Sequence, residues 1–315
     1  MSIDGASQAV RCAQWARSQR MAPIGTAGSF AGVLVVEADG PWPANVADIP
    51  WLSHLRPALA DTGTRLQTIL TPRRTTGHHV ILYQSVQSRS GFSAYAGVEC
   101  VVDKTDVAEA ALALLQGGTA EPTLSIDVLV CTHGRRDACC GSAGTVLALE
   151  AMAATELEGV RLWRTSHLGG HRFAPTALVL PAGTSWAGLD LPSLARVARD
   201  KPSPEDVVAR YRGCTGLASP ALQALEQAVL LRVGPDLLRC ARLGRERDGR
   251  VELDVVGPQS AGQTWSGTPV AGRLLPIPDC GAPIEAATSS QLEIAVTDLR
   301  VAALVPTGPQ PLGSA

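Results

Sequence analysis

This 315-residue chain contains few lysines and few aromatic residues, and its net charge is small. Only two of its 27 basic residues are lysines, Lys104 and Lys201, which indicates a codon-composition bias and not a functional signal. The 29 acidic residues leave a net charge of −2, so the basic surplus of a generic nucleic-acid-binding protein is missing. Hydrophobic residues make up 45% of the chain, which excludes a disordered protein and predicts a sizeable core.

Long apolar runs and an export signal are also missing. No stretch approaches the ~20 apolar residues of a membrane-spanning helix, and the N-terminus lacks a basic region followed by an apolar one. Eight cysteines are too few for a disulfide scaffold in a chain of this length. We therefore expect a cytoplasmic protein with reduced thiols that binds neither membrane nor nucleic acid. A cluster of such thiols then indicates a metal or redox site.

The pattern of expected strands and helices predicts an α/β protein with three parts. We expect an N-terminal α/β domain at residues 1–120, a second α/β domain at 121–202 and a smaller C-terminal α+β extension at 203–315, whose tail (306–315) frays. The first two parts share a loosely similar strand–loop–helix–strand order, which hints at a duplicated fold. The expected strands lie at residues 33–36, 66–70, 79–83, 98–101, 126–130, 160–165, 176–180, 251–255 and 292–296. The expected helices lie at residues 105–116, 142–154 and 191–198 and directly after the Ser-Pro pairs at 203–204 and 219–220.

Cysteine and histidine gather in one part of the chain. Six of the 14 cysteine and histidine residues fall between positions 131 and 171. They are Cys131, His133, Cys139, Cys140, His167 and His171. Eight residues separate Cys131 from Cys140, and three separate His167 from His171. Because thiolates and imidazoles are the ligands of zinc, copper and iron–sulfur clusters, this pattern predicts a metal site.

The local sequence allows these side chains to converge. The cysteine motif follows an expected strand and precedes an expected helix, whose N-terminus favours a thiolate. Gly169-Gly170 separates the two histidines and would cost a helix about 1 kcal/mol per glycine, so we expect a loop whose N–H groups can approach a ligand closely. Arg135, Arg136 and Arg172 are expected to add positive charge nearby. Asp137 is expected to pair with a neighbouring arginine.

Chemistry alone leaves several alternatives open. Cys139 and Cys140 are adjacent, so their chemistry does not choose between them, and His133 is a further candidate ligand. Two cysteines and two histidines also suit zinc, which would make the protein a zinc-stabilised binding module. A thiol oxidoreductase using Cys139 or Cys140 is a third hypothesis, although the chain has no Cys-x-x-Cys motif. In the simplest alternative these residues are scattered core cysteines and surface histidines.

Other sequence features are assigned to structural roles. The cysteines outside the motif are expected to be buried structural thiols; they are Cys12, Cys100, Cys214, Cys240 and Cys280. No Gly-x-Ser-x-Gly nucleophile elbow, Walker A loop or dinucleotide-binding fingerprint is present. The cysteine–histidine region is therefore the one motif that predicts a function.

Two segments resemble the sucrase/ferredoxin-like family. They are Cys131 to Gly141 (CTHGRRDACCG) and residues 166–174 (SHLGGHRFA). GTA at 25–27 and EADGPWP at 37–43 also resemble the N-terminal region of that family, so the resemblance covers about residues 10–200. The family is similar to thioredoxin-like [2Fe-2S] ferredoxins, in which a widely spaced cysteine pair is followed by Cys-x3-Cys. In this chain His167 and His171 have the spacing of that second cysteine pair.

The resemblance implies a thioredoxin-like ferredoxin domain at residues 121–202 and one [2Fe-2S] cluster. Its ligands would be Cys131 and Cys140 on the inner iron and His167 and His171 on the outer, more exposed iron. The implied function is one-electron transfer or redox sensing with a redox partner protein or reductase, so we expect an electron carrier more than a catalyst. The word sucrase suggests a glycosidase, which needs two carboxylates at a sugar cleft. Asp137 is the only acid in the motif, so hydrolysis is not expected.

Histidine ligands predict a high and pH-dependent reduction potential. Two neutral imidazoles in place of two thiolates remove negative charge, so an electron is added more easily. Rieske centres, which have two such histidines, lie at about −150 to +300 mV, against about −400 mV for plant-type ferredoxins. An exposed imidazole N–H can lose its proton on oxidation, so the potential should fall as the pH rises above the histidine pKa of the oxidised state. Voltammetry between about pH 6 and pH 10 measures this, and a flat potential would contradict exposed histidine ligands.

Overall fold

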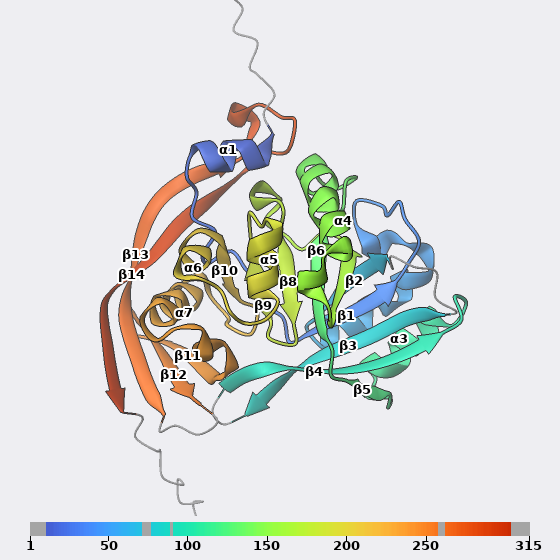
Figure 1. Cartoon of the computed structure of the whole chain (residues 1–315), viewed down its shortest axis with the longest axis horizontal. Helices are drawn as coiled ribbons and strands as arrows, with labels where there is room; N and C mark the ends of the chain where they lie inside the picture. The colour runs from blue at the N-terminus through green and yellow to red at the C-terminus, as the bar shows by residue number, and fades with distance from the viewer. Residues whose placement is uncertain (1–10, 71–76, 89–90, 258–261, 304–315) are drawn as a thin grey trace, which may run out of the picture.

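The structure, a computed structural model, describes residues 11–70, 77–88, 91–257 and 262–303. These residues form a mixed α/β fold in which seven α-helices pack against one large sheet of 14 strands (Figure 1). The expected α/β class is confirmed, whereas the expected frayed tail at 306–315 lies outside the described residues. Within the described part of the chain, no helix is long and apolar enough to cross a bilayer.

The helices are short and the strands are numerous. The α-helices are α1 (Cys12–Ser18), α2 (Arg56–Asp61), α3 (Val107–Leu115), α4 (Thr145–Ala153), α5 (Leu191–Val197), α6 (Pro204–Arg210) and α7 (Pro220–Val233). The strands are β1 (Gly32–Glu37), β2 (Thr64–Leu70), β3 (His78–Ser88), β4 (Gly91–Val102), β5 (Glu121–Thr123), β6 (Ile126–Cys131), β7 (Val160–Thr165), β8 (Ala177–Leu180), β9 (Thr184–Trp186), β10 (Tyr211–Cys214), β11 (Ala241–Arg247), β12 (Arg250–Val256), β13 (Gln263–Ile277) and β14 (Ser289–Ala303). Each expected strand and helix is confirmed, and β3, β4 and β14 are longer than expected. The structure adds elements that were not expected, among them α1, β10 and β13.

Two parts of the sheet have the same internal topology. The full strand order is β10-β9-β8-β6-β7-β2-β1-β3-β4-β11-β12-β13-β14, with β5 paired to β4. It contains β2-β1-β3-β4 and β7-β6-β8-β9, in which the first two strands along the chain are parallel and the next two antiparallel. A helix follows each unit, α3 or α5, and the units meet where β2 and β7 pair. One sheet thus runs through all three sequence segments, and their division into domains stays a prediction.

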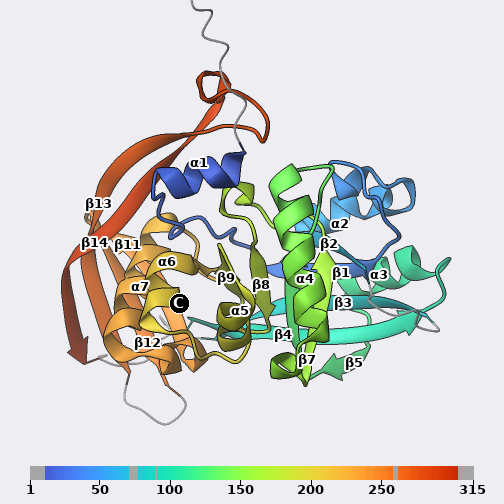
Figure 2. The same ribbon diagram turned by 45° about the horizontal axis from the view of Figure 1, so that its top comes forward.

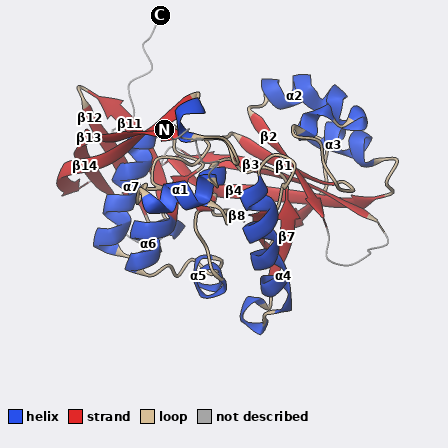
Figure 3. Cartoon of the chain, turned by 90° about the horizontal axis from the view of Figure 1, so that it is seen from above, coloured by secondary structure: helices blue, strands red, loops and turns tan. Residues whose placement is uncertain are grey.

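Strand β1 is apolar at every central position because helices cover both faces of the sheet there. Val33 and Val35 belong to one hydrophobic core cluster, and Leu34 and Val36 belong to a second one. Figure 3 shows α2 and α3 on one side of the sheet and α4 to α7 on the opposite side. Burial on both faces explains why the apolar run at 33–36 is continuous and not alternating.

The C-terminal hairpin reaches the N-terminal helix. Strands β13 and β14 pack against α7 and curve until their connecting loop lies beside α1 (Figures 1 and 2). The indole Nε1 of Trp15 on α1 donates a hydrogen bond to the carbonyl oxygen of Pro276 on β13, at 3.2 Å. Two segments from opposite ends of the chain therefore lie side by side.

A buried carboxylate links the two similar units of the sheet. Asp127 on β6 is 1% exposed and accepts hydrogen bonds from Arg161 Nε and Nη2 at 2.7 and 2.6 Å. Trp163 Nε1 donates to it at 2.6 Å, and so does the Tyr83 hydroxyl from β3. These donors replace the water that the carboxylate loses on burial, which explains an acid inside an apolar strand.

Replacing this carboxylate should destabilise the fold far more than replacing an exposed one. We expect Asp127→Asn to lower the free energy of unfolding by about 3 kcal/mol, because the buried network loses its carboxylate acceptor and Arg161 keeps only Glu99 as a charged partner. Asp39→Asn is the matched control, since Asp39 pairs with Lys104 and the two side chains are 72% and 63% exposed. The control should cost less than about 0.5 kcal/mol. Denaturant unfolding measures both losses, and equal losses would contradict the assigned network.

Candidate metal site

The cysteine and histidine motifs lie at the carboxyl ends of two neighbouring parallel strands. Strand β6 ends at Cys131 and β7 ends at Thr165, and these two residues are paired in register. His167 follows Thr165 by two residues, so the histidine motif begins beside the cysteine motif. Open α/β sheets commonly bind ligands at the carboxyl ends of their strands. The fold therefore brings both motifs to one edge of the sheet.

Cys131 and Cys140 form a buried thiol pair. Both residues have no exposed surface, and each thiol shifts the pKa of the other. The Cys140 thiol, and to a smaller extent the His167 side chain, lowers the pKa of Cys131 despite its burial. The Cys131 thiol and burial raise the pKa of Cys140. The pair is thus arranged to hold one negative charge by itself, and two thiolates here would need a cation.

Cys140 reaches this position because a wide helical turn packs tightly on the end of β6. A π-helical turn spans Cys140–Gly144 and continues into α4. A Cβ atom at Gly144 would lie 2.0 Å from the Cys131 carbonyl oxygen, so only glycine allows this approach. Such π-helical turns are frequent at functional sites.

The two histidines lie on a loop, as the two intervening glycines predicted. Gly169 and Gly170 have φ angles of 80° and 68°, which glycine adopts without strain. His167 and His171 are half-buried, and their ring centroids lie 6.2 Å apart. Two imidazoles bound to one tetrahedral metal at ~2.1 Å would have centroids about 5 Å apart. The observed separation is therefore about 1 Å larger than that of two imidazoles on one metal.

Asp137 joins the cysteine motif to the histidine motif. One carboxylate oxygen lies 2.8 Å from His171 Nδ1, and the other accepts the N–H groups of Cys139 (2.8 Å) and Cys140 (3.1 Å). Burial raises the pKa of Asp137, but the contact with His171 and the backbone hydrogen bonds outweigh it and lower the pKa. The carboxylate favours a proton on His171 Nδ1, which leaves Nε2 free to bind a metal.

The expected arginine partner of Asp137 is therefore wrong. Arg135 and Arg136 are exposed, and Arg172 donates to Gln291 Oε1 at 2.8 and 2.6 Å. Among the described residues, the basic side chain that contacts the Asp137 carboxylate is His171. A local sequence reading could not find this pair, because the histidine comes from the other motif.

Two arginines that the sequence did not single out support the histidine loop. Arg65 on β2 donates to the His167 carbonyl oxygen at 2.6 Å. Arg212 on β10 is 1% exposed and donates to the Gly169 carbonyl oxygen at 3.2 Å. Burial lowers the pKa of Arg212 to about 9, and repulsion from other arginines adds to this effect. A buried cation at this point stabilises negative charge on the nearby thiols.

Buried imidazole nitrogens without partners lie beside the thiol pair. Nδ1 and Nε2 of His133 and Nδ1 of His167 have no hydrogen-bond partner among the described residues. His133 is 2% exposed and packs edge-on against Trp42, with ring centroids 5.7 Å apart. Burial lowers the pKa of His133, which favours the neutral form that binds metals. Because buried polar atoms are normally paired, these nitrogens fit a site that holds a metal.

A second group of metal-binding side chains lies next to the first. Sulfur atoms of Cys12, Cys139 and Cys280 and a carboxylate oxygen of Asp137 all lie within 4.8 Å of one another and could hold a metal ion. The sequence assigned Cys12 and Cys280 to separate structural roles, but α1 and the β13–β14 loop bring both to Cys139. They lie 127 and 141 residues from Cys139, so no spacing pattern could have indicated this group.

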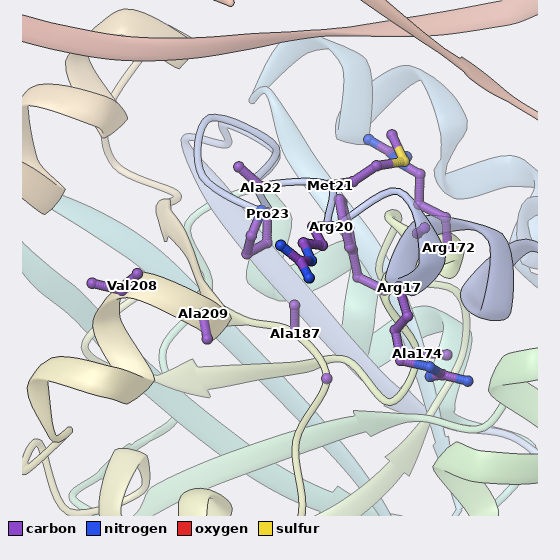
Figure 4. A pocket seen from close by; sticks show the side chains of 13 residues that line it. Arg17, Arg20, Met21, Ala22, Pro23, Arg172, Ala174, Ala187, Val208 and Ala209 are labelled. Atoms are coloured by element: carbon purple, nitrogen blue, oxygen red, sulfur yellow. The ribbon is translucent and has the colours of Figure 1, made fainter. Parts of the chain in front are cut away.

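Two cavities flank this region. A polar cavity of about 500 Å³ is lined by His133, His167, Arg65 and Arg136 among others. A mainly apolar cavity of about 430 Å³ lies between α1, the segment after it, the turn after His171 and α6 (Figure 4). None of the four expected ligands lines the apolar cavity, whereas His167 lines the polar one. Access to the candidate site is therefore through the polar cavity.

The fold and the site define an α/β protein with a candidate cysteine–histidine metal site at the edge of its sheet. The sequence model of the Sucrase/ferredoxin-like family matches residues 23–213, which is more than half of the chain. The chain therefore belongs to the sucrase/ferredoxin-like family, as its motifs predicted. No curated protein and no solved structure matches the chain significantly.

The histidine loop should tolerate no side chain at position 170. A Cβ atom there would lie 2.6 Å from Arg212 Nη2, and the φ angle of Gly170 is left-handed. Gly159 is the matched control, because its φ is 82° and a Cβ atom there would meet nothing within 4 Å. We expect Gly159→Ala to cost about 1 kcal/mol of unfolding free energy from backbone strain alone. Gly170→Ala should cost at least about twice that, because the held guanidinium must also move. Equal costs in denaturant unfolding would contradict the tight contact.

Proposed function

We propose that Cys131, Cys140, His167 and His171 hold one [2Fe-2S] cluster and that the protein transfers single electrons or senses redox state. One observation carries the proposal: two buried thiols lie at the end of β6 and in the turn before α4, and two half-buried imidazoles lie on the loop that follows the neighbouring strand β7. Membership of the sucrase/ferredoxin-like family supports it. The order β6-α4-β7-β8-β9-α5 supports a thioredoxin-like ferredoxin domain at residues 121–202.

The surroundings of the two adjacent cysteines favour Cys140 as the second thiolate. The Cys140 sulfur faces Cys131. The Cys139 sulfur instead lies 3.3 Å from the sulfur of Cys280 and 3.6 Å from that of Cys12. The thiols of Cys139 and Cys140 therefore have different neighbours, which supports Cys140 as the ligand that the family spacing implied.

The burial of the ligands supports an inner and an outer iron. Cys131 and Cys140 are enclosed, whereas the imidazoles of His167 and His171 are partly exposed, and His167 lines the polar cavity. A bound cluster would supply one-electron chemistry, and its histidine side would be the one nearest to solvent. Arg65 and Arg136 line the same cavity. A redox partner with an acidic surface would dock there favourably, because its charge complements these arginines.

The surrounding side chains hold the ligands in place. Asp137 orients His171 and binds the backbone of Cys140, so one carboxylate sets the positions of two proposed ligands. Arg65 and Arg212 hold the carbonyl oxygens of His167 and Gly169. Two cysteines release two protons when they bind metal as thiolates, and the positive charges of Arg65 and Arg212 lower the cost of the resulting charge.

A zinc-binding module is the second candidate function. The same two cysteines and two histidines suit a tetrahedral zinc ion, and the unpartnered nitrogens of His133 offer an alternative ligand. The pH-dependent, one-electron chemistry proposed above is impossible for zinc, which has no redox activity. Metal content and colour therefore distinguish the two candidates.

Removing any of the four proposed ligands should abolish the cluster. We expect the purified parent protein to be reddish-brown, with about two irons and two acid-labile sulfides per chain and an EPR signal after reduction. Cys131→Ala, Cys140→Ala, His167→Ala and His171→Ala should each lose most of the iron and sulfide. Cys139→Ala and Cys214→Ala are the controls. The Cys139 sulfur lies against that of Cys280, and Cys214 is a buried thiol on β10.

Three results would contradict this assignment. Colourless protein that contains zinc would favour the binding module. Bleaching by Cys139→Ala but not by Cys140→Ala would reverse the cysteine choice. If His133→Ala loses the colour of the cluster and His167→Ala keeps it, His133 and not His167 is the ligand. Circular dichroism of each variant separates loss of the cluster from loss of the fold.

A further inference from the structure

We infer that Cys12, Cys139, Cys280 and Asp137 form a second metal site, which binds one zinc ion and is separate from the proposed cluster. Its four donor atoms come from three segments: α1, the cysteine motif and the loop between β13 and β14. The site shares none of its ligands with the proposed iron–sulfur site. Separate substitutions therefore test the two sites.

The donor spacing fits a tetrahedral ion. Zinc binds thiolates at ~2.3 Å and carboxylate oxygens at ~2.0–2.2 Å, which places neighbouring donors about 3.5 to 3.8 Å apart. The sulfur of Cys139 lies 3.3 Å from that of Cys280 and 3.6 Å from that of Cys12. Oδ2 of Asp137 lies 3.4 Å from the sulfur of Cys12. The remaining donor pairs lie within 4.8 Å, so shifts of about 1 Å or less would place these four atoms around one ion.

The chemistry of the donors favours zinc. Three thiolates and a carboxylate form a closed set without a position for substrate, which is typical of structural zinc sites. Mutual distances within 4.8 Å suit a single ion, because a two-iron cluster must hold its ligand pairs farther apart. Binding converts three thiols into thiolates and releases three protons to solvent, while Asp137 already carries its negative charge. Soft sulfur donors exclude magnesium and calcium, which prefer oxygen.

The burial of the donors gives the ion a protected position with an entry path. Cys12, Cys139 and Asp137 are 0, 4 and 5% exposed, whereas Cys280 is half-buried on the β13–β14 loop. Nδ1 of His171 lies 3.1 Å from the sulfur of Cys12, so its N–H can donate to that thiolate. The resulting site has the net charge of a four-cysteine zinc site, and this hydrogen bond lowers the cost of burying it.

A zinc ion here would link α1 and the β13–β14 loop to the cysteine motif. Figures 1 and 2 show α1 against the loop end of the β13–β14 hairpin. Asp137 would bind zinc through one oxygen while its other oxygen holds the N–H groups of Cys139 and Cys140. Asp137 would thus contact the backbone of both cysteines while serving as a ligand of the second site only.

Metal analysis of the purified full-length chain tests the inference. We expect one zinc per chain in addition to iron, and lower zinc affinity by more than ~100-fold in Cys280→Ser and Cys12→Ser. Both variants should keep their iron and sulfide. Cys131→Ala should show the reverse pattern, with the iron lost and the zinc kept. Cys240→Ser is the matched control, because Cys240 is a half-buried thiol outside both groups and should change neither metal.

The outcomes separate this inference from the proposed function. Parent protein without zinc, or zinc that survives both Cys12→Ser and Cys280→Ser, would overturn the second site. A Cys139–Cys280 disulfide found by mass spectrometry in the purified protein, or iron or copper at these thiols, would also overturn it. Zinc that depends on Cys280 in a protein without iron would support the second site and contradict the proposed cluster. Cobalt added to the metal-free parent should give thiolate charge-transfer absorption that Cys280→Ser lacks.

Discussion

The parallel pairing of β6 with β7 is the constraint on which the candidate site depends. Parallel strands end at the same edge of the sheet, so Cys131 and the histidine loop must lie together although more than thirty residues separate them. The π-helical turn after the cysteine motif then places Cys140 against Cys131. Any change that shifts the register of β6 against β7 would separate the two motifs.

Electrostatics decides what such a site can hold. The buried thiols of Cys131 and Cys140 shift each other's pKa in opposite directions and so resist a second negative charge, and unpartnered imidazole nitrogens lie beside them. A metal centre resolves both features at once, because it stabilises thiolates and accepts nitrogen lone pairs. Arg65 and Arg212 assist by placing positive charge behind the histidine loop.

Much of the fold follows from local sequence pattern. The apolar run at 33–36, the capped helices after Ser203 and Ser219 and the alternating strands near the C-terminus all appear as expected. The long hairpin and β10 were missed or underestimated, because their pairing depends on distant segments. The gathering of the two motifs was also predictable, since both follow expected strands and carry metal-binding side chains.

The interactions that organise the site could not be predicted in this way. Asp137 has arginine neighbours in sequence, yet the folded loop turns its carboxylate toward His171 and the backbone. Cys12 and Cys280 carry no motif of their own and reach Cys139 only because α1 and the C-terminal hairpin pack together. Contacts between remote segments leave no local pattern, so three-dimensional coordinates are needed to see them.

Histidine ligation of a two-iron centre is the central claim of this account. Pulsed EPR of the reduced protein, labelled with ¹⁵N-histidine, observes it directly. Two strongly coupled histidine nitrogens are predicted, and His167→Ala or His171→Ala should abolish them together with the cluster. A reduced iron–sulfur signal without strongly coupled histidine nitrogen, or no such signal in protein that retains its metal, would contradict the claim.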